Sequence, residues 1–282
     1  MTALTHDAGL HTAPLRPAAA WLTQRLTGPV CQLGVFLPAG FPAPRHDVAA
    51  LRLFAASGAD ILEVGIPDAA ARYDGPVIRS AYRQALGAGT RVADAIETVQ
   101  HAASTTDASV VVMTYWQGVK AYTPARFADD LASAGAAGAM IVDLPAAHTA
   151  SWTHAARSAG IHTPHLVSRT ATDHDLAHAA EHTSGWTYVP AAEALTGYTG
   201  DLNTTALASF TRRLRATSTT PVVTGIGIST PDKAAQVRHL VNGCVIGSPI
   251  VRPLLHTGGS AGLRFAADTV AAFAEALRSG PR

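Results

Sequence analysis

The chain has 282 residues, a formal net charge of +1 and two cysteines, Cys31 and Cys244. This charge balance gives no electrostatic case for binding nucleic acid or an anionic membrane, and two distant cysteines do not suggest a disulfide framework. Alanine supplies much of the 48% hydrophobic fraction and aromatic residues only 6%, which favours helices packed closely against a sheet.

The N-terminal region is predicted to be a leader and a short helix over residues 1–28, followed by one domain over 29–282. The first 21 residues have no basic start followed by an apolar core, so they do not match a secretory signal. No stretch approaches the roughly 18 uninterrupted apolar residues that would span a membrane. We therefore expect a cytoplasmic protein without a membrane partner.

Short apolar runs alternate with longer amphipathic segments along the chain. The runs have strand length and are mostly rich in Val, Ile and Leu. They predict eight strands, at 31–37, 60–65, 109–115, 138–144, 165–168, 186–190, 221–225 and 243–247.

The intervening segments carry the start signals of helices. Thr123 precedes Pro124, and Thr230 precedes Pro231 and Asp232, as expected for an N-cap followed by the first helical turn. Eight strands that alternate with helices and are apolar on both faces predict an α/β fold, a (β/α)8 TIM barrel in a single domain. A doubly wound open sheet is the alternative.

Two carboxylates flank the loop after the second predicted strand, in the stretch LEVGIPDAAARYDGP. Glu63 ends the strand and Asp74 closes the loop. Barrel enzymes place their chemistry at the carboxyl ends of the strands, so this position favours a catalytic role. The alternative is that Glu63 pairs with an arginine from a neighbouring element.

Glycines follow the seventh and eighth strands, in VVTGIGIST and CVIGSPIV. Gly227 and Gly247 would let backbone N–H groups approach an anion, and a helix N-terminus follows each loop. Barrels often bind phosphate between these two loops. The preceding loop, with Thr196 and Gly197, could cover such a site or could be a surface loop.

The order of these motifs resembles the tryptophan synthase α subunit family, whose members cleave indole-3-glycerol phosphate. The resemblance rests on LEVGIP, DGPVIRSAYRQALGAGT, VVMTYW, IVDLP, LTG, GIGIST and IGSPIV, which span about 31–254. It implies a barrel lyase that needs no metal or organic cofactor.

The resemblance also implies roles for individual residues. Glu63 would be the catalytic acid and base, and Asp74 would hold the indole N–H. The expected indole pocket consists of Phe36, Tyr115 and Tyr188. The expected phosphate contacts are Thr196, Gly197, Gly227, Gly247 and Ser248.

The chain departs from the family pattern at three places. The loop at 68–73 reads DAAARY where the family usually has Phe-Ser-Asp-Pro, in a region that meets the β subunit. Gln117 replaces an asparagine beside the bulky Trp116. The loop before Thr196 lacks Ser-Arg-x-Gly and places Glu193 near the expected phosphate, and the like charges would repel if they met.

Three hypotheses fit these departures. The first is a lyase that acts alone, in a specialised biosynthetic pathway, and has lost its β-subunit interface. The second is a conventional α subunit with a matched β partner. The third is a non-catalytic barrel that binds indole and regulates a partner, although retention of both carboxylates argues against it.

Other polar residues are predicted to lie outside the site. His174, His178 and His182 share a helical face with metal-site spacing, but we interpret them as an exposed helix that begins with a Thr172–Asp175 capping box. His148, His154 and the Asp129–Asp130 pair are predicted at the surface. Arg72 could pair with Asp74, reach the phosphate or point into water.

Overall fold

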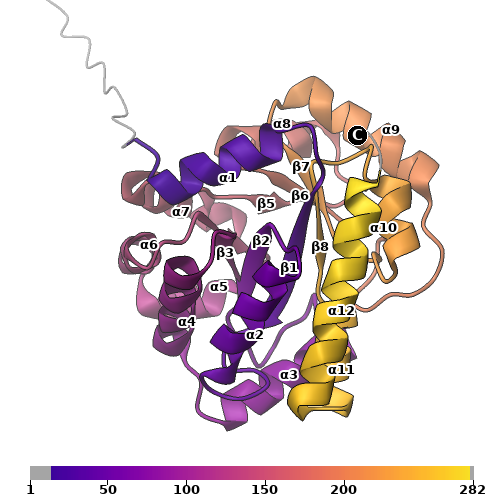
Figure 1. Ribbon diagram of the computed structural model, residues 1–282. Coiled ribbons are helices and arrows are strands. Elements are labelled where there is room, and N and C mark those ends of the chain that lie inside the picture. The colour runs from indigo at the N-terminus through magenta and orange to yellow at the C-terminus, as the bar shows by residue number, and fades with distance from the viewer. Residues whose placement is uncertain (1–13, 280–282) are drawn as a thin grey trace, which may run out of the picture.

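The computed structural model describes residues 14–279 and contains eight strands surrounded by helices (Figure 1). The strands are β1 (Gln32–Pro38), β2 (Ile61–Gly65), β3 (Ser109–Thr114), β4 (Gly138–Ile141), β5 (His165–Leu166), β6 (Thr187–Val189), β7 (Val222–Thr224) and β8 (Gly243–Ile246). The helices are α1 (Pro17–Thr27), α2 (His46–Ala56), α3 (Pro76–Gly87), α4 (Val92–Thr105), α5 (Trp116–Tyr122), α6 (Pro124–Ser133), α7 (Ala146–Ala159), α8 (Asp173–His182), α9 (Thr204–Thr217), α10 (Pro231–Val237), α11 (Ser248–His256) and α12 (Gly259–Arg278).

The eight predicted strands are confirmed, and each begins within one residue of its predicted start. The largest difference is at β4, which ends at Ile141 rather than at residue 144. There the chain turns, and the Leu144 N–H bonds back to the Ile141 carbonyl at 3.4 Å. The side chains of all strands except β5 are buried, because helices cover the sheet on its outer face.

The strands run parallel in the order β4-β3-β2-β1-β8-β7-β6-β5. The two end strands approach each other through a bridge between Gly138 and His162. The His162 N–H donates to the Ala137 carbonyl at 2.9 Å, and the Ala139 N–H donates to the His162 carbonyl at 3.0 Å. The sheet is therefore a nearly closed barrel, and the open doubly wound alternative is wrong.

Helix α1 covers the amino ends of the strands. Leu22 and Leu26 are fully buried, and the Asn242 side chain, just before β8, donates to the Leu26 carbonyl at 2.8 Å. Thr23 bonds His162 at 2.9 Å near the start of β5. This end of the barrel is thus closed, which leaves the opposite, carboxyl end for a site. The predicted leader lies partly at residues 1–13, outside the described residues.

One of the two predicted N-caps is confirmed. The Thr230 hydroxyl accepts the Lys233 N–H at 3.3 Å. Thr123 takes the N-cap position of α6, but its side chain makes no capping hydrogen bond. The reason is that Thr123 also ends α5, where its N–H bonds the Lys120 carbonyl and its φ is +73°.

Candidate active site

Glu63 lies on β2, between Phe36 of β1 and Val111 of β3. Its side chain is buried and faces the cavity at the carboxyl end of the barrel. Among residues 14–279, no group donates a hydrogen bond to the carboxylate and no arginine pairs with it, so the ion-pair alternative is wrong. Burial, and the nearby Asp74, raise the pKa of Glu63 to about 8. The carboxyl is therefore mainly protonated at neutral pH.

Asp74 lies at the end of the loop between β2 and α3. Asp74 is 2% exposed, and its carboxylate accepts hydrogen bonds from Tyr115 Oη at 2.8 Å and from Thr196 Oγ1 at 3.2 Å. Burial raises the pKa of Asp74 to about 6, while these two hydrogen bonds and the charge of Arg79 act in the opposite direction. Asp74 is therefore mainly ionised at neutral pH, when Glu63 is protonated.

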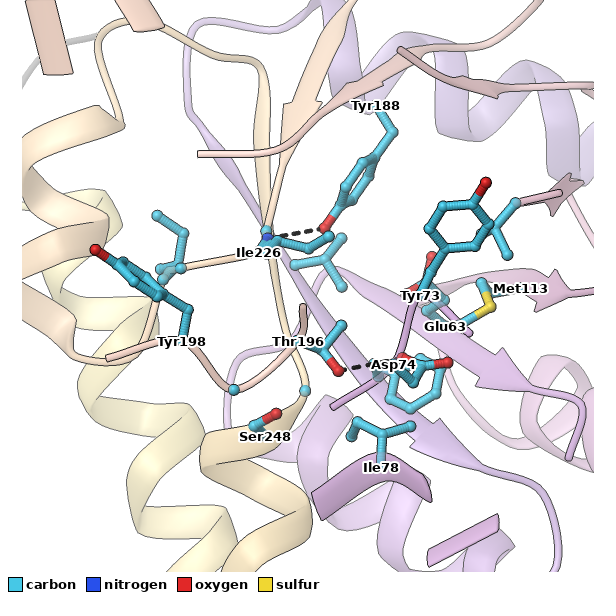
Figure 2. Close-up of a pocket in the computed structure, with 18 of the residues that line it drawn as sticks. Glu63, Tyr73, Asp74, Ile78, Met113, Tyr188, Thr196, Tyr198, Ile226 and Ser248 are labelled. Atoms are coloured by element: carbon cyan, nitrogen blue, oxygen red, sulfur yellow. Dashed lines mark hydrogen bonds between the residues drawn. The ribbon is translucent and has the colours of Figure 1, made fainter. Parts of the chain in front are cut away.

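The two carboxyl groups line one cavity of about 230 Å³, far larger than a single water requires. Its walls are mainly apolar and aromatic, and Figure 2 shows Glu63, Asp74 and Ser248 around it. The three predicted indole-pocket residues, Phe36, Tyr115 and Tyr188, all line it. The cavity also contains residues that the sequence did not single out: Tyr73, Ile78, Met113, Met140, Val142, Tyr198, Ile226 and Arg252.

The predicted phosphate-binding residues line the same cavity. Gly197 and Gly227 have φ values of +92° and +100°, which other residues rarely adopt. The Ser248 hydroxyl, at the start of α11, is buried and has no hydrogen-bond partner within the described residues. The Thr196 hydroxyl donates to Asp74 at 3.2 Å and accepts the Gly75 N–H at 2.8 Å.

Close contacts between loops explain two further glycines. A Cβ atom at Gly75 would overlap the Thr196 carbonyl oxygen. Glycine at this position therefore lets the loop that carries Asp74 pack against the loop that carries Thr196. A Cβ atom at Gly225 would overlap the Tyr188 phenol oxygen, which accepts the Ile226 N–H at 3.0 Å (Figure 2). Glycine at position 225 thus leaves room for the Tyr188 phenol to reach the Ile226 N–H.

Comparison with known proteins identifies the family. The model of the family described as tryptophan synthase alpha chain matches residues 31–278. The chain belongs to the tryptophan synthase alpha chain family. Members of this family are carbon–carbon lyases.

Individual members of the tryptophan synthase alpha chain family resemble the chain over most of their length. The alpha chain of Streptomyces avermitilis is 36% identical over 246 residues, covering 87% of this chain and 88% of the relative. That of Streptomyces coelicolor is 36% identical over 248 residues, covering 88% and 90%. A structure of tryptophan synthase from Mycobacterium tuberculosis superposes with a TM-score of 0.83 at 31% identity, covering 95% of this chain and all of that one.

The loop that departs from the tryptophan synthase alpha chain pattern makes specific side-chain contacts. Arg72, whose partner the sequence left open, forms an ion pair with Asp143 at 3.1 Å and contacts neither Asp74 nor the glycine loops. The next residue, Tyr73, lines the cavity and has a ring nearly parallel to that of Tyr115.

Two other polar residues, Glu193 and His148, have surroundings that differ from those predicted. Glu193 does not line the cavity, because it accepts the Arg169 N–H at 2.6 Å and pairs with the Arg169 side chain at 3.7 Å. Glu193 therefore does not lie where it would repel a phosphate bound in the cavity. His148 is half-buried rather than solvated, since its ring stacks on Trp116 at 4.8 Å.

The histidine face of helix α8 is exposed at His174 and His178, and the predicted capping box between Thr172 and Asp175 is confirmed. Within residues 14–279, no group of three His, Cys, Asp or Glu side chains has the arrangement of a metal site. In the same residues, no helix has the length and hydrophobicity needed to cross a membrane.

Two of the residues that sequence reasoning missed had a detectable signal. Met113 pairs with Gly65 at the carboxyl end of β3, where barrel residues face the site. Arg252 lies four residues after Ser248 on α11, so the two share one helix face. Among the described residues lining the cavity, Arg252 has the only cationic side chain.

Proposed function

We propose that the protein is an indole-3-glycerol-phosphate lyase that turns over without a β subunit. The observation that carries this proposal is the burial of Glu63 and Asp74 in one mainly apolar cavity, where burial raises the pKa of Glu63 to about 8 and that of Asp74 to about 6. The reaction breaks the bond between indole C3 and the adjacent glycerol carbon, giving indole and glyceraldehyde 3-phosphate.

The protonation states suit the two halves of this retro-aldol cleavage. The Glu63 carboxylic acid gives its proton to indole C3, and the resulting carboxylate takes the proton of the glycerol hydroxyl as the carbon–carbon bond breaks. Positive charge develops on the indole nitrogen when C3 is protonated. Asp74, as an ionised acceptor of the indole N–H, stabilises that charge more in the transition state than in the ground state.

The glycine loops and the start of α11 form the proposed phosphate end of the cavity. Gly197, Gly227, Gly247 and Ser248 offer backbone N–H groups, and the Ser248 hydroxyl is free to donate. Arg252 adds positive charge at the same end, which supports a phosphorylated substrate although the loop before Thr196 lacks an arginine. Thr196 itself holds Asp74 in this scheme.

The decisive experiment mixes the purified protein alone with indole-3-glycerol phosphate and follows both products. We expect turnover that Glu63→Gln abolishes and that the exposed control Glu181→Gln leaves within about twofold of the wild type. Slow turnover that rises greatly when a β subunit is added would instead identify a conventional α subunit. If indole binds but no cleavage occurs in either case, the lyase proposal is wrong.

A further inference from the structure

The loop between β2 and α3 is held by hydrogen bonds among its own residues. Asp68 Oδ1 accepts the N–H groups of Ala70 at 2.7 Å and Ala71 at 3.1 Å, which closes a tight turn at the start of the loop. The Ala71 side chain is buried, and the Ala71 backbone carbonyl accepts the Asp74 N–H at 3.0 Å. The backbone leading into Asp74 is thus fixed at both ends.

An ion pair joins the middle of this loop to the neighbouring strands. Arg72 Nη2 lies 3.1 Å from Asp143 Oδ2, and Asp143 Oδ1 accepts the Trp116 N–H at 2.6 Å. Asp143 follows β4, and Trp116 begins α5 after β3. The Asp143 side chain is 14% exposed, so the arginine docks on an acceptor that is already held by a backbone donor.

Tyr73 connects this ion pair to the site. Its ring lies at 18° to the Tyr115 ring, with the centroids 6.5 Å apart, and the Arg72 guanidinium lies 5.6 Å from the Tyr73 centroid. The Tyr73 N–H donates to Tyr115 Oη at 3.3 Å, and the same oxygen donates its proton to Asp74 at 2.8 Å.

These contacts form one path from the loop to the carboxylate. Because Tyr115 Oη accepts from Tyr73, its own proton is directed to Asp74. We propose that Arg72 and Tyr73 are positioning residues that hold this loop closed, so that Tyr115 and Asp74 are set for the indole N–H without a partner chain. This inference rests on the proposed function. It means that residues of this chain hold the loop between β2 and α3 over the cavity.

Steady-state kinetics of Arg72→Ala and Tyr73→Ala test the proposal. Arg72 and Tyr73 are proposed to act through Asp74, which stabilises charge mainly in the transition state, so kcat should fall by about fivefold or more while KM stays within about twofold. The acidic limb of the pH profile of kcat should move to higher pH, because loss of part of the Tyr115 hydrogen bond raises the pKa of Asp74. A variant that merely contained fewer correctly folded molecules would have a lower kcat with an unchanged pH profile. Arg72→Lys should restore most of kcat.

A matched control comes from α6, where Arg126 pairs with Asp130 at 3.5 Å and is exposed to a similar degree. Arg126→Ala removes an ion pair remote from the cavity and should leave kcat and the pH profile unchanged. If the Arg72 and Tyr73 variants behave like this control, the two residues do not position Asp74 and the proposal is overturned.

A second measurement does not depend on activity. Asp143→Asn keeps an acceptor for the Trp116 N–H but removes the charge facing Arg72. Trypsin should then cut after Arg72 about fivefold faster than in the wild type, relative to cleavage after the exposed Arg45 in the same digest. An unchanged rate overturns the proposal. Should the wild type show no turnover, the lyase function fails, and the digest alone decides whether the loop is held closed.

Discussion

Replacing Glu63 with glutamine is expected to stabilise the protein, increasingly as the pH rises. In the folded chain the pKa of Glu63 is about 8, whereas the ordinary value is 4.5. Between these values the folded state keeps a proton that the unfolded state has released. The stability given by the protonated form is therefore fully present below about pH 4.5, falls above it, and is lost by about pH 8.

The magnitude follows from the difference between the two pKa values. At about 1.4 kcal/mol for each pH unit, that difference corresponds to about 5 kcal/mol. This is an upper limit, because water can enter the open side of the cavity and relieve part of the burial. Glutamine has nearly the same size and does not ionise. Glu63→Gln should match the wild type within about 1 kcal/mol at pH 5 and exceed it by about 2–5 kcal/mol at pH 9.

Urea unfolding from about pH 5 to about pH 9 measures this difference directly. Glu181→Gln is the matched control, since Glu181 is an exposed glutamate on α8 and its replacement should leave the pH dependence of unfolding unchanged. Curves for Glu63→Gln and the wild type that run parallel across this range would refute the reasoning. Glu63 would then ionise in the fold as it does in water, and it could not act as the proposed acid.

Three further substitutions test other parts of the site. Tyr115→Phe removes a hydrogen bond that lowers the pKa of Asp74, so the acidic limb of kcat/KM should move above about pH 6, with a loss of about tenfold in rate. Gly225→Ala would force a methyl group against the Tyr188 phenol and should lower the free energy of unfolding by about 1–3 kcal/mol, measured in urea. Arg252→Gln should raise KM about tenfold with little change in kcat if the guanidinium faces the phosphate, and an unchanged KM would exclude that contact.

The strands, and the location of Glu63 and Asp74 at the carboxyl end of the barrel, could be predicted because their signals are local. An apolar run with turn residues on both sides defines a strand whatever its neighbours are, and each strand began within one residue of its predicted start. Glu63 and Asp74 were found because a barrel exposes its strand ends to one site. In the folded chain both carboxyl groups line the same cavity.

The partners of exposed polar side chains could not be predicted in the same way. Arg72 bonds Asp143, which is 71 residues away, and nothing in either neighbourhood marks the pair. Glu193 turns to Arg169, a contact that becomes available only when the loops after β5 and β6 lie side by side. Long side chains choose among several nearby partners with small differences in free energy, about 0–1 kcal/mol.

The loop at 68–73, which departs from the family pattern, affects the pKa of Glu63 through the charge of Asp74. Burial is the larger cause of the raised pKa of Glu63, and the charge of Asp74 is the second. A loop that keeps an ionised Asp74 close to Glu63 therefore also keeps Glu63 protonated. Opening the loop by Arg72→Ala should lower the pKa of Glu63 as well as disturb Asp74, and the basic limb of the kcat profile would move to lower pH. A profile in which only the acidic limb moves would show that the loop controls Asp74 alone.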